Sequence, residues 1–318
     1  MSSLLMMILD AFPELFLAGL LYPWTGVLIR WRANYTPRDS ASEGFLARSA
    51  GRGPSYFTML MKIGSVEGLD GLLKGILPTL AVMECWELLG LPSIVLVAYL
   101  HYLEFHPSEF VAIAKVCLLW VMISIPYSII RNRAITTTQD LPYLSIRKAF
   151  PALLTQSERQ RPYTIYTAPG LAAAHFAWTA FILIISCVRH FVFRIPFFRV
   201  AQHDSALQTA LTVLVWAFAM VLNALILTPL EVAIVRLSTQ GQPGESEVGT
   251  YSLLPFAGEP DIGDGIAVDT SSQVIQLRSS AVPYLSLADC LRRISEEEGR
   301  AVLYRGWWVT AFRGIVLL

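Results

Sequence analysis

Three prolines and three arginines recur in this sequence at a constant spacing. The interval is 103 residues between neighbouring members of the set Pro23, Pro126 and Pro229. An arginine follows each proline after seven positions, which gives Arg30, Arg133 and Arg236. Each proline closes a long apolar run, where its ring bends a helix, and each arginine adds a permanent positive charge. A fixed period of this kind indicates a repeated structural unit.

Residue types that support enzymatic chemistry do not occur here in a working order. The segments expected to be ordered contain no Ser-His-Asp order, no glycine-rich phosphate loop and no HExxH motif. The cysteines are scattered, without a CxxC pair or a histidine at ligand spacing, so we expect small apolar fillers of helix faces. They are Cys85, Cys117, Cys187 and Cys290. We therefore predict no enzyme, no cofactor and no metal site.

The composition is that of a membrane protein. Hydrophobic residues make up 54% of the chain and charged residues 15%, and the mean hydropathy is +0.53. Soluble domains are about a quarter charged, so this chain is far too apolar for that class. The formal net charge is zero, which gives no reason to expect a nucleic-acid partner.

Six apolar runs are separated by polar connections. The runs are 3–29, 76–102, 110–130, 171–188, 206–234 and 307–318. Five of them have about the 20 residues that cross a bilayer as a helix. The sixth is too short to do so, and we expect either a fragment or an incomplete last helix.

The polar connections repeat a second pattern. Each is rich in Arg and Lys, and the first and third contain amphipathic stretches, Tyr56–Ser65 and Leu285–Ile294, that predict short surface helices. A glycine turn then leads into the next run. The third connection is longer, and we expect a disordered insertion at about 238–280. The chain divides into repeats at 1–105, 106–203 and 204–318, with the three basic connections on one side of the membrane.

The motifs of the third repeat resemble the signature of the mitochondrial carrier family. The window Pro229–Leu237 is similar to P-x-[DE]-x-x-[KR]-x-[KR], and Glu298–Gly306 to EGxxxLYRG. Glu67–Gly75 is a second good copy of the latter half. The resemblance implies an all-α integral membrane protein, a six-helix bundle of three helical hairpin repeats with three-fold pseudosymmetry. It also implies that Pro23, Pro126 and Pro229 kink the odd-numbered helices.

In typical carriers, acids and bases of the three signatures form a ring of ion pairs that closes the matrix side. The residues at the acidic positions here are Thr25, Ser128 and Glu231. Those at the basic positions are Leu28, Arg131 and Ile234. If Arg131 and Glu231 meet across the bundle, one ion pair replaces the usual three, whereas Thr25 and Ser128 add only hydrogen bonds. The alternative is that Arg131 and Glu231 are charges at loop ends.

The family's solute contacts can be carried over only by position. The residue seven past the glycine of the LYRG turn often faces solute, which gives Arg313 after Gly306 and Val82 after Gly75. In the second repeat the turn is degenerate, and counting from Ala168 gives His175. An arginine inside a membrane is costly unless it has a function, and Arg313 matches members that bind anions. His175 can equally be a partner in a hydrogen bond between helices.

Two hypotheses about function remain open. The first is a solute carrier of the mitochondrial inner membrane that moves a small anionic metabolite or nucleotide. The second is a transport-inactive adaptor of the outer membrane, with protein partners in fusion, lipid traffic or protein insertion. The eroded gate and the insertion favour the adaptor, and Arg313 with the intact third signature favours the carrier. We favour a multi-pass carrier in contact with mitochondrial lipids, because transport is what this fold usually does.

Overall fold

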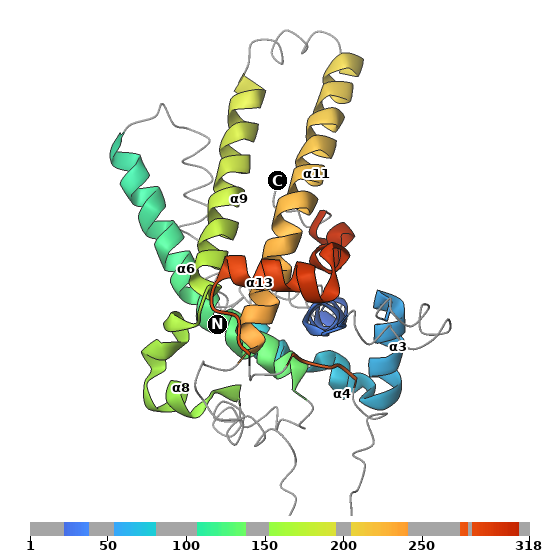
Figure 1. Cartoon of the computed structure of the whole chain (residues 1–318). Helices are drawn as coiled ribbons and strands as arrows, with labels where there is room; N and C mark the ends of the chain where they lie inside the picture. The colour runs from blue at the N-terminus through green and yellow to red at the C-terminus, as the bar shows by residue number, and fades with distance from the viewer. Residues whose placement is uncertain are drawn as a thin grey trace, which may run out of the picture.

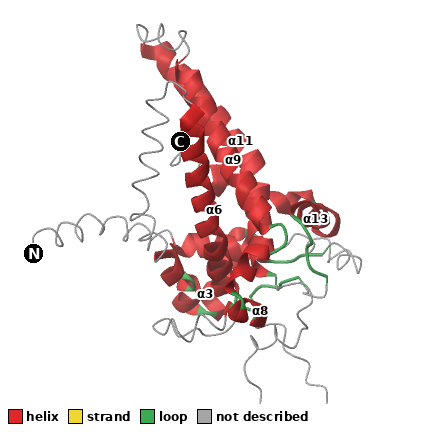
Figure 2. Cartoon of the chain, turned by 90° about the vertical axis from the view of Figure 1, so that its left-hand side faces the viewer, coloured by secondary structure: helices red, strands yellow, loops and turns green. Residues whose placement is uncertain are grey.

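A computed structural model describes residues 22–37, 54–80, 107–137, 153–194, 205–240, 274–278 and 282–311. Within these residues the chain is helical and contains no strand. The long helices are α6 (Pro107–Thr136), α9 (Leu171–Arg194) and α11 (Ser205–Thr239). They stand side by side, with the short helices at one end of the group (Figures 1 and 2). We call this end the loop side.

Each repeat contributes a short helical segment to the loop side. The first repeat has α3 (Tyr56–Val66) and α4 (Gly68–Leu73). The second has α8 (Gln156–Gln160) and η2 (Pro162–Thr167), and the third has α13 (Leu287–Arg293), η6 (Ile294–Glu298) and η7 (Arg300–Tyr304). The surface helices predicted at Tyr56–Ser65 and Leu285–Ile294 are therefore confirmed, with small changes at their ends.

The six predicted apolar runs are each helical where the structure describes them. The first ends in helical residues 22–33, the second begins in 76–80, and the sixth begins in 307–311. Residues 3–21, 81–102 and 312–318 of these runs lie outside the described residues, so the incomplete last helix is not tested. Of the described helices, one stretch, Met220–Thr239 within α11, is long and apolar enough to cross a membrane, and Leu171–Ile185 is a shorter apolar stretch.

Two of the predicted prolines lie inside long helices. Pro126 lies in α6 and Pro229 in α11. Proline lacks the N–H that would bond the preceding turn, and its ring crowds that turn's carbonyl. α6 changes direction along its length (Figure 1), as expected of a helix with an internal proline. The third proline, Pro23, lies near the start of the described part of its helix.

The core has its centre where the proline-containing helices of all three repeats meet. One buried cluster joins Tyr22, Ile29 and Ala33 of the first repeat to Ile135 of α6 and Val235 of α11. A larger cluster fills the space between α6, α9, α11 and α13. These contacts bury the apolar faces of the three repeats against one another at the loop side.

Part of the segment predicted to be disordered is described by the structure and packed against other helices. α11 continues to Thr239, and residues 274–278 are described and packed, with Val274 and Ile275 buried. The prediction of disorder over 238–280 is therefore wrong for these residues. The error has a physical cause, because the composition of the whole segment outweighed the adjacent apolar pair Val274 and Ile275. Residues 241–273 and 279–280 lie outside the described part of the chain.

Gly170 allows the second and third repeats to approach closely. Its φ is +76°, and a Cβ there would lie 3.0 Å from Ser286 Cα and overlap the backbone nitrogen of Leu287. We expect Gly170→Ala to lower the free energy of unfolding by more than about 1 kcal/mol, since a positive φ and a backbone clash both oppose alanine. Thermal unfolding of the purified protein in detergent measures this change.

The matched control is Gly64→Ala in α3, where nothing lies within 4 Å of the added Cβ. Alanine is favoured over glycine inside a helix by about 0.5–1 kcal/mol. Gly64→Ala should therefore leave the melting temperature unchanged or raise it. Equal melting temperatures for the two variants would contradict the close contact at Gly170.

Candidate functional site

The three periodic arginines each form an ion pair with a glutamate of the same repeat. The pairs are Arg30 Nη2 with Glu67 Oε2 at 2.9 Å, Arg133 Nη1 with Glu158 Oε2 at 2.6 Å, and Arg236 Nη2 with Glu298 Oε2 at 2.9 Å. Glu67 also pairs with Lys74 at 3.0 Å. We call these six residues, three arginines and three glutamates, the arginine ring.

Each arginine also donates to the backbone of the next repeat. Arg30 Nε bonds the carbonyl of Ile135 at 2.7 Å, and Arg133 Nε bonds that of Ser238 at 3.1 Å. Arg236 Nη2 returns to the first repeat, at the carbonyl of Asn34, 2.8 Å away. The bonds therefore run from repeat 1 to 2, from 2 to 3 and from 3 to 1. The arginine ring closes the loop side as a continuous circle of contacts.

Four of the six charged residues of the ring are buried, and the other two, Glu67 and Arg133, are partly buried. Arg30 and Arg236 are 2% and 3% exposed, and Glu158 is 1% exposed. Removing one partner of a buried pair costs about 3–5 kcal/mol, because the remaining charge has no compensation. Arg305 lies near Arg236. Its pKa is lowered to about 10, mainly by burial and to a smaller extent by the positive charge of Arg236. Arg305 donates to the carbonyl of Trp31 and so also joins the third repeat to the first.

Glu158 was missed in the sequence because it is out of register. In the first and third repeats the glutamate precedes a glycine of positive φ by eight residues, Glu67 before Gly75 and Glu298 before Gly306. Eight residues before Gly170 stands Pro162, and Glu158 lies four positions earlier. The side chains of Thr155 and Glu158 form a capping box at the start of α8. That motif, Thr-x-x-Glu, was the signal that could have identified Glu158.

Glu231 forms an ion pair with a base that the family pattern does not predict. Its Oε2 accepts from Arg32 Nη1 at 2.7 Å and from Thr310 Oγ1 at 2.8 Å. Arg131 instead donates to the hydroxyl of Tyr127 at 2.9 Å, and its guanidinium lies 4.7 Å from that ring's centre. The pairing of Arg131 with Glu231 suggested by the sequence is thus replaced by a pair between Arg32 and Glu231.

The position of Arg32 explains why it, and not Arg131, forms the ion pair with Glu231. Arg32 follows Leu28 by four residues and Thr25 by seven, so the three share one helical face. The base is therefore displaced by one turn from the position now held by Leu28. Arg32 also donates to Thr310 Oγ1 at 2.9 Å and to the carbonyl of Arg305 at 3.0 Å. We call Arg32, Glu231 and Thr310 the inter-repeat latch.

The other predicted gate positions are apolar or locally bonded. Leu28 and Ile234 are buried. Thr25 Oγ1 donates to the carbonyl of Tyr22 at 2.8 Å. Ser128 donates to the carbonyl of Ile125 at 2.8 Å and lies 3.1 Å from His175 Nε2. Among the described gate positions, the ionic contact between repeats is thus made by Glu231.

Of the predicted solute contacts, Arg313 and Val82 lie outside the described residues. His175 is buried on α9 and hydrogen-bonded to Ser128 of α6, which is the helix-to-helix contact considered in the sequence. The structure also changes the residue from which the seven positions are counted in the second repeat, which was Ala168 in the sequence analysis. Gly75, Gly170 and Gly306 have φ values of +82°, +76° and +74° and each precedes a helix, so Gly170 is the equivalent glycine. Seven residues past Gly170 stands Ala177.

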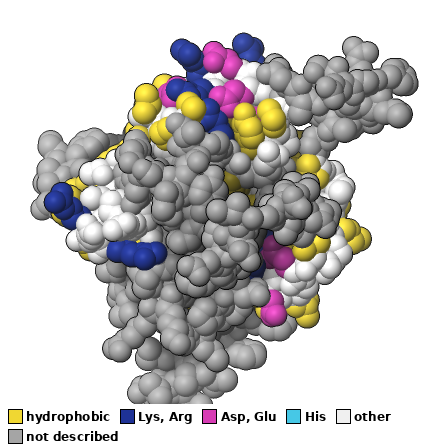
Figure 3. Space-filling model, turned by 60° about the horizontal axis from the view of Figure 1, so that its bottom comes forward, with side chains coloured by type: hydrophobic (Ala, Val, Ile, Leu, Met, Phe, Trp, Pro, Cys, Tyr) yellow, Lys and Arg dark blue, Asp and Glu magenta, His cyan; other side chains and the backbone are white. Residues whose placement is uncertain are grey.

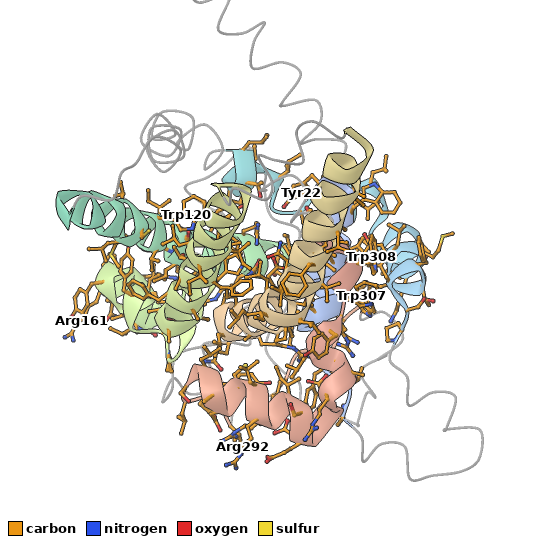
Figure 4. The ribbon with its side chains drawn as sticks, turned by 90° about the horizontal axis from the view of Figure 1, so that it is seen from above. Tyr22, Trp120, Arg161, Arg292, Trp307 and Trp308 are labelled. Atoms are coloured by element: carbon orange, nitrogen blue, oxygen red, sulfur yellow. The ribbon has the colours of Figure 1, made fainter. Side chains whose placement is uncertain are left out.

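The described residues contain no group of three or more His, Cys, Asp or Glu side chains that could hold a metal ion. The aromatic residues at the loop side instead pack among themselves. Tyr56 contacts Trp31 and Trp308, with ring centres 5.8 Å and 5.5 Å apart. Figure 4 shows Trp308 on the side toward α3, whereas Arg161 and Arg292 lie at the periphery. The aromatic cluster thus lies apart from these two peripheral arginines.

The Arg133–Glu158 pair predicts a pH dependence of stability. Burial raises the pKa of Glu158, but hydrogen bonds from Arg133 and Thr155 outweigh it and hold the pKa below its usual value. Glu158 therefore stabilises the fold above its unfolded pKa of about 4.3, and this stability is lost as pH falls through the lower folded pKa. We expect Glu158→Gln to lower the free energy of unfolding at pH 7 by about 3–5 kcal/mol.

The control is Glu296→Gln, whose partner Arg292 is 73% exposed in its side chain. Exposed pairs contribute about 0–1 kcal/mol, so this variant should unfold almost as the wild type does. Unfolding is measured in detergent between pH 3 and 7. A Glu158→Gln protein with the stability and the acid dependence of the wild type would show that the pair is not stabilising.

The C-terminal third of the chain is similar to a known protein family. Residues 205–317 match the family model described as Mitochondrial carrier protein. Neither a curated protein nor a solved structure matches the chain. Proteins of this family are transporters and not enzymes. The match is partial: it covers the repeat that contains Glu231, Arg236 and Glu298, and this part of the chain is similar to proteins of the mitochondrial carrier family.

Proposed function

We propose that this protein carries a small anionic solute, a metabolite or nucleotide, across the mitochondrial inner membrane by alternating access. The observation that carries the proposal is the ion pair of Arg32 with Glu231. It joins the first repeat to the third at the acidic position of the carrier signature. In this family that position belongs to the contacts that close one side of the bundle.

The latch can act as a gate because it is buried and joins two repeats. The side chains of Arg32 and Glu231 are 4% and 11% exposed. Opening the loop side would separate them, and a solute must supply the difference in free energy between the two states. Thr310 lies on the segment that follows the Gly306 turn. Arg313, the proposed anion contact, comes three positions later in the sequence, so solute binding and latch opening would involve one segment.

Charge reversal tests the latch directly. Arg32→Glu and Glu231→Arg should each reduce solute exchange by at least about tenfold, since each places like charges together in a buried site. The double variant should recover much of the loss because the pair is restored with opposite polarity. Exchange is measured in liposomes that contain the purified protein.

The matched control reverses the exposed pair Arg292 and Glu296. Its two single variants and its double variant should all exchange solute at the wild-type rate. If the Arg32 and Glu231 changes reduced exchange additively, with no recovery in the double variant, the two residues would not act as a gate pair.

The anionic character of the solute is proposed from Arg313. We expect uptake of anions, such as carboxylates and nucleotides, and no uptake of neutral or cationic solutes. Arg313→Ala should abolish anion uptake, whereas His175→Ala should affect folding more than solute choice, because His175 bonds Ser128. Uptake of each solute class in liposomes measures this. Unchanged anion uptake by Arg313→Ala would remove this residue from the site.

The second candidate is a transport-inactive adaptor of the outer membrane. It is favoured by Leu28 and Ile234, which replace two gate bases by buried apolar side chains. A tag placed between residues 241 and 273 separates the two candidates in isolated mitochondria. The carrier hypothesis expects the tag to stay protected from protease after rupture of the outer membrane. Cleavage of the tag, together with no uptake of any solute class, would favour the adaptor.

A further inference from the structure

Residues 274–278, which we call the strap, lie across the loop side of the bundle. In Figure 1 the strap is the short orange-red coil beside α4. Its backbone pairs with the first repeat just after helical residues 22–33. The amide of Tyr35 donates to the carbonyl of Gln276 at 2.7 Å, and the amide of Gln276 donates to Asn34 Oδ1 at 2.9 Å.

The strap belongs to the third repeat and is bonded to η6 of that repeat. Arg278 donates to both carboxylate oxygens of Glu297, from Nε at 2.9 Å and from Nη2 at 2.8 Å. The hydroxyl of Tyr35 donates to the same carboxylate at 3.0 Å. The hydrogen bonds from Arg278 lower the pKa of Glu297 by more than burial raises it, so this pKa stays below its usual value. The pair is therefore charged at neutral pH. Glu297 thus links the strap, the first repeat and η6.

The apolar end of the strap is buried. Val274 and Ile275 are 6% and 8% exposed and belong to a cluster with Val27, Leu28 and Met59. Removing these two apolar side chains from water stabilises the contact between the strap and the first repeat. Leu28 is the residue at the basic position of the first repeat. The strap therefore packs with the part of the gate that lacks its family charge.

We propose that the strap is a built-in brake that holds the loop side closed. This rests on the function proposed above, since it concerns the regulation of the same gate. The strap and the inter-repeat latch join the same pair of repeats, the first and the third. A movement that separates Arg32 from Glu231 also pulls the segment 34–35 away from Glu297. The hydrogen bonds and the buried cluster of the strap therefore oppose that opening.

The brake is tested by the distance between the first and third repeats at the loop side. Nitroxide labels are placed at Met61→Cys on α3 and Arg300→Cys on η7, both exposed positions, in a protein without its native cysteines. Figure 3 shows this end of the molecule, with a cluster of charged side chains at its upper edge and further charged side chains to the left and right. The distance distribution is measured by pulsed electron paramagnetic resonance, in lipid nanodiscs.

Arg278→Ala removes the ion pair to Glu297 without changing the buried cluster. We expect a second, longer distance, with the ratio of open to closed protein raised about tenfold, which corresponds to about 1.4 kcal/mol. The control Arg292→Ala removes an exposed pair in the same repeat and should leave the distribution as in the wild type. A variant with two cysteines, Tyr35→Cys and Gln276→Cys, should hold the closed state when oxidised and release it when reduced, as read by solute exchange.

The outcomes separate the brake from transport. An Arg278→Ala distribution identical to the wild type, in a protein whose melting temperature shows that it is folded, overturns the brake. A longer distance with no uptake of any solute supports the brake and contradicts the transport function. A longer distance with faster exchange supports both. Faster exchange without a change in distance overturns the brake, because the gate would then respond to Arg278 by another route.

Discussion

A buried guanidinium needs a counter-charge and acceptors for its donors, and the loop side of this protein is organised by that need. Arg30, Arg133 and Arg236 each take a glutamate from their own repeat and a carbonyl from the next. The requirement for charge compensation fixes the pairing within a repeat, and the remaining donors fix the order of the repeats around the axis. Local pairing and the assembly of the three repeats therefore depend on the same side chains.

At two places the sequence departs from the repeated motif, and a buried ion pair is still formed. Glu158 lies four residues before the position that its counterparts occupy, and Arg32 lies four residues after Leu28. In both cases a charge of the same sign is supplied from a neighbouring turn and reaches a partner at 2.6–2.7 Å. A long flexible side chain can span one turn of helix, so charge is retained where the motif is lost. The repeat that departs most from the pattern in sequence is still part of the arginine ring.

The sequence predicted the features that depend on period and polarity. The loop-side helices and the prolines inside α6 and α11 follow from spacing and hydrophobic pattern alone, whereas the division into three repeats stays a prediction. It could not predict the partner of Glu231, because that choice depends on which side chains reach one another across the bundle. The sequence did not predict that Val274 and Ile275 are packed, because their burial depends on contacts with α3, which is far away in the sequence. The register at Gly170 required the backbone conformation.

Two-sided thiol labelling of Thr25→Cys in sealed liposomes tests whether the loop side of the bundle is closed. Thr25 is exposed and shares a helical face with Leu28 and Arg32, on the side of the latch away from the loops. With the ring and latch closed, a membrane-impermeant reagent should label it from the side of the short junctions and not from the loop side. Glu231→Gln should permit labelling from the loop side as well. Equal labelling from both sides in the unmodified gate would contradict a closed loop side.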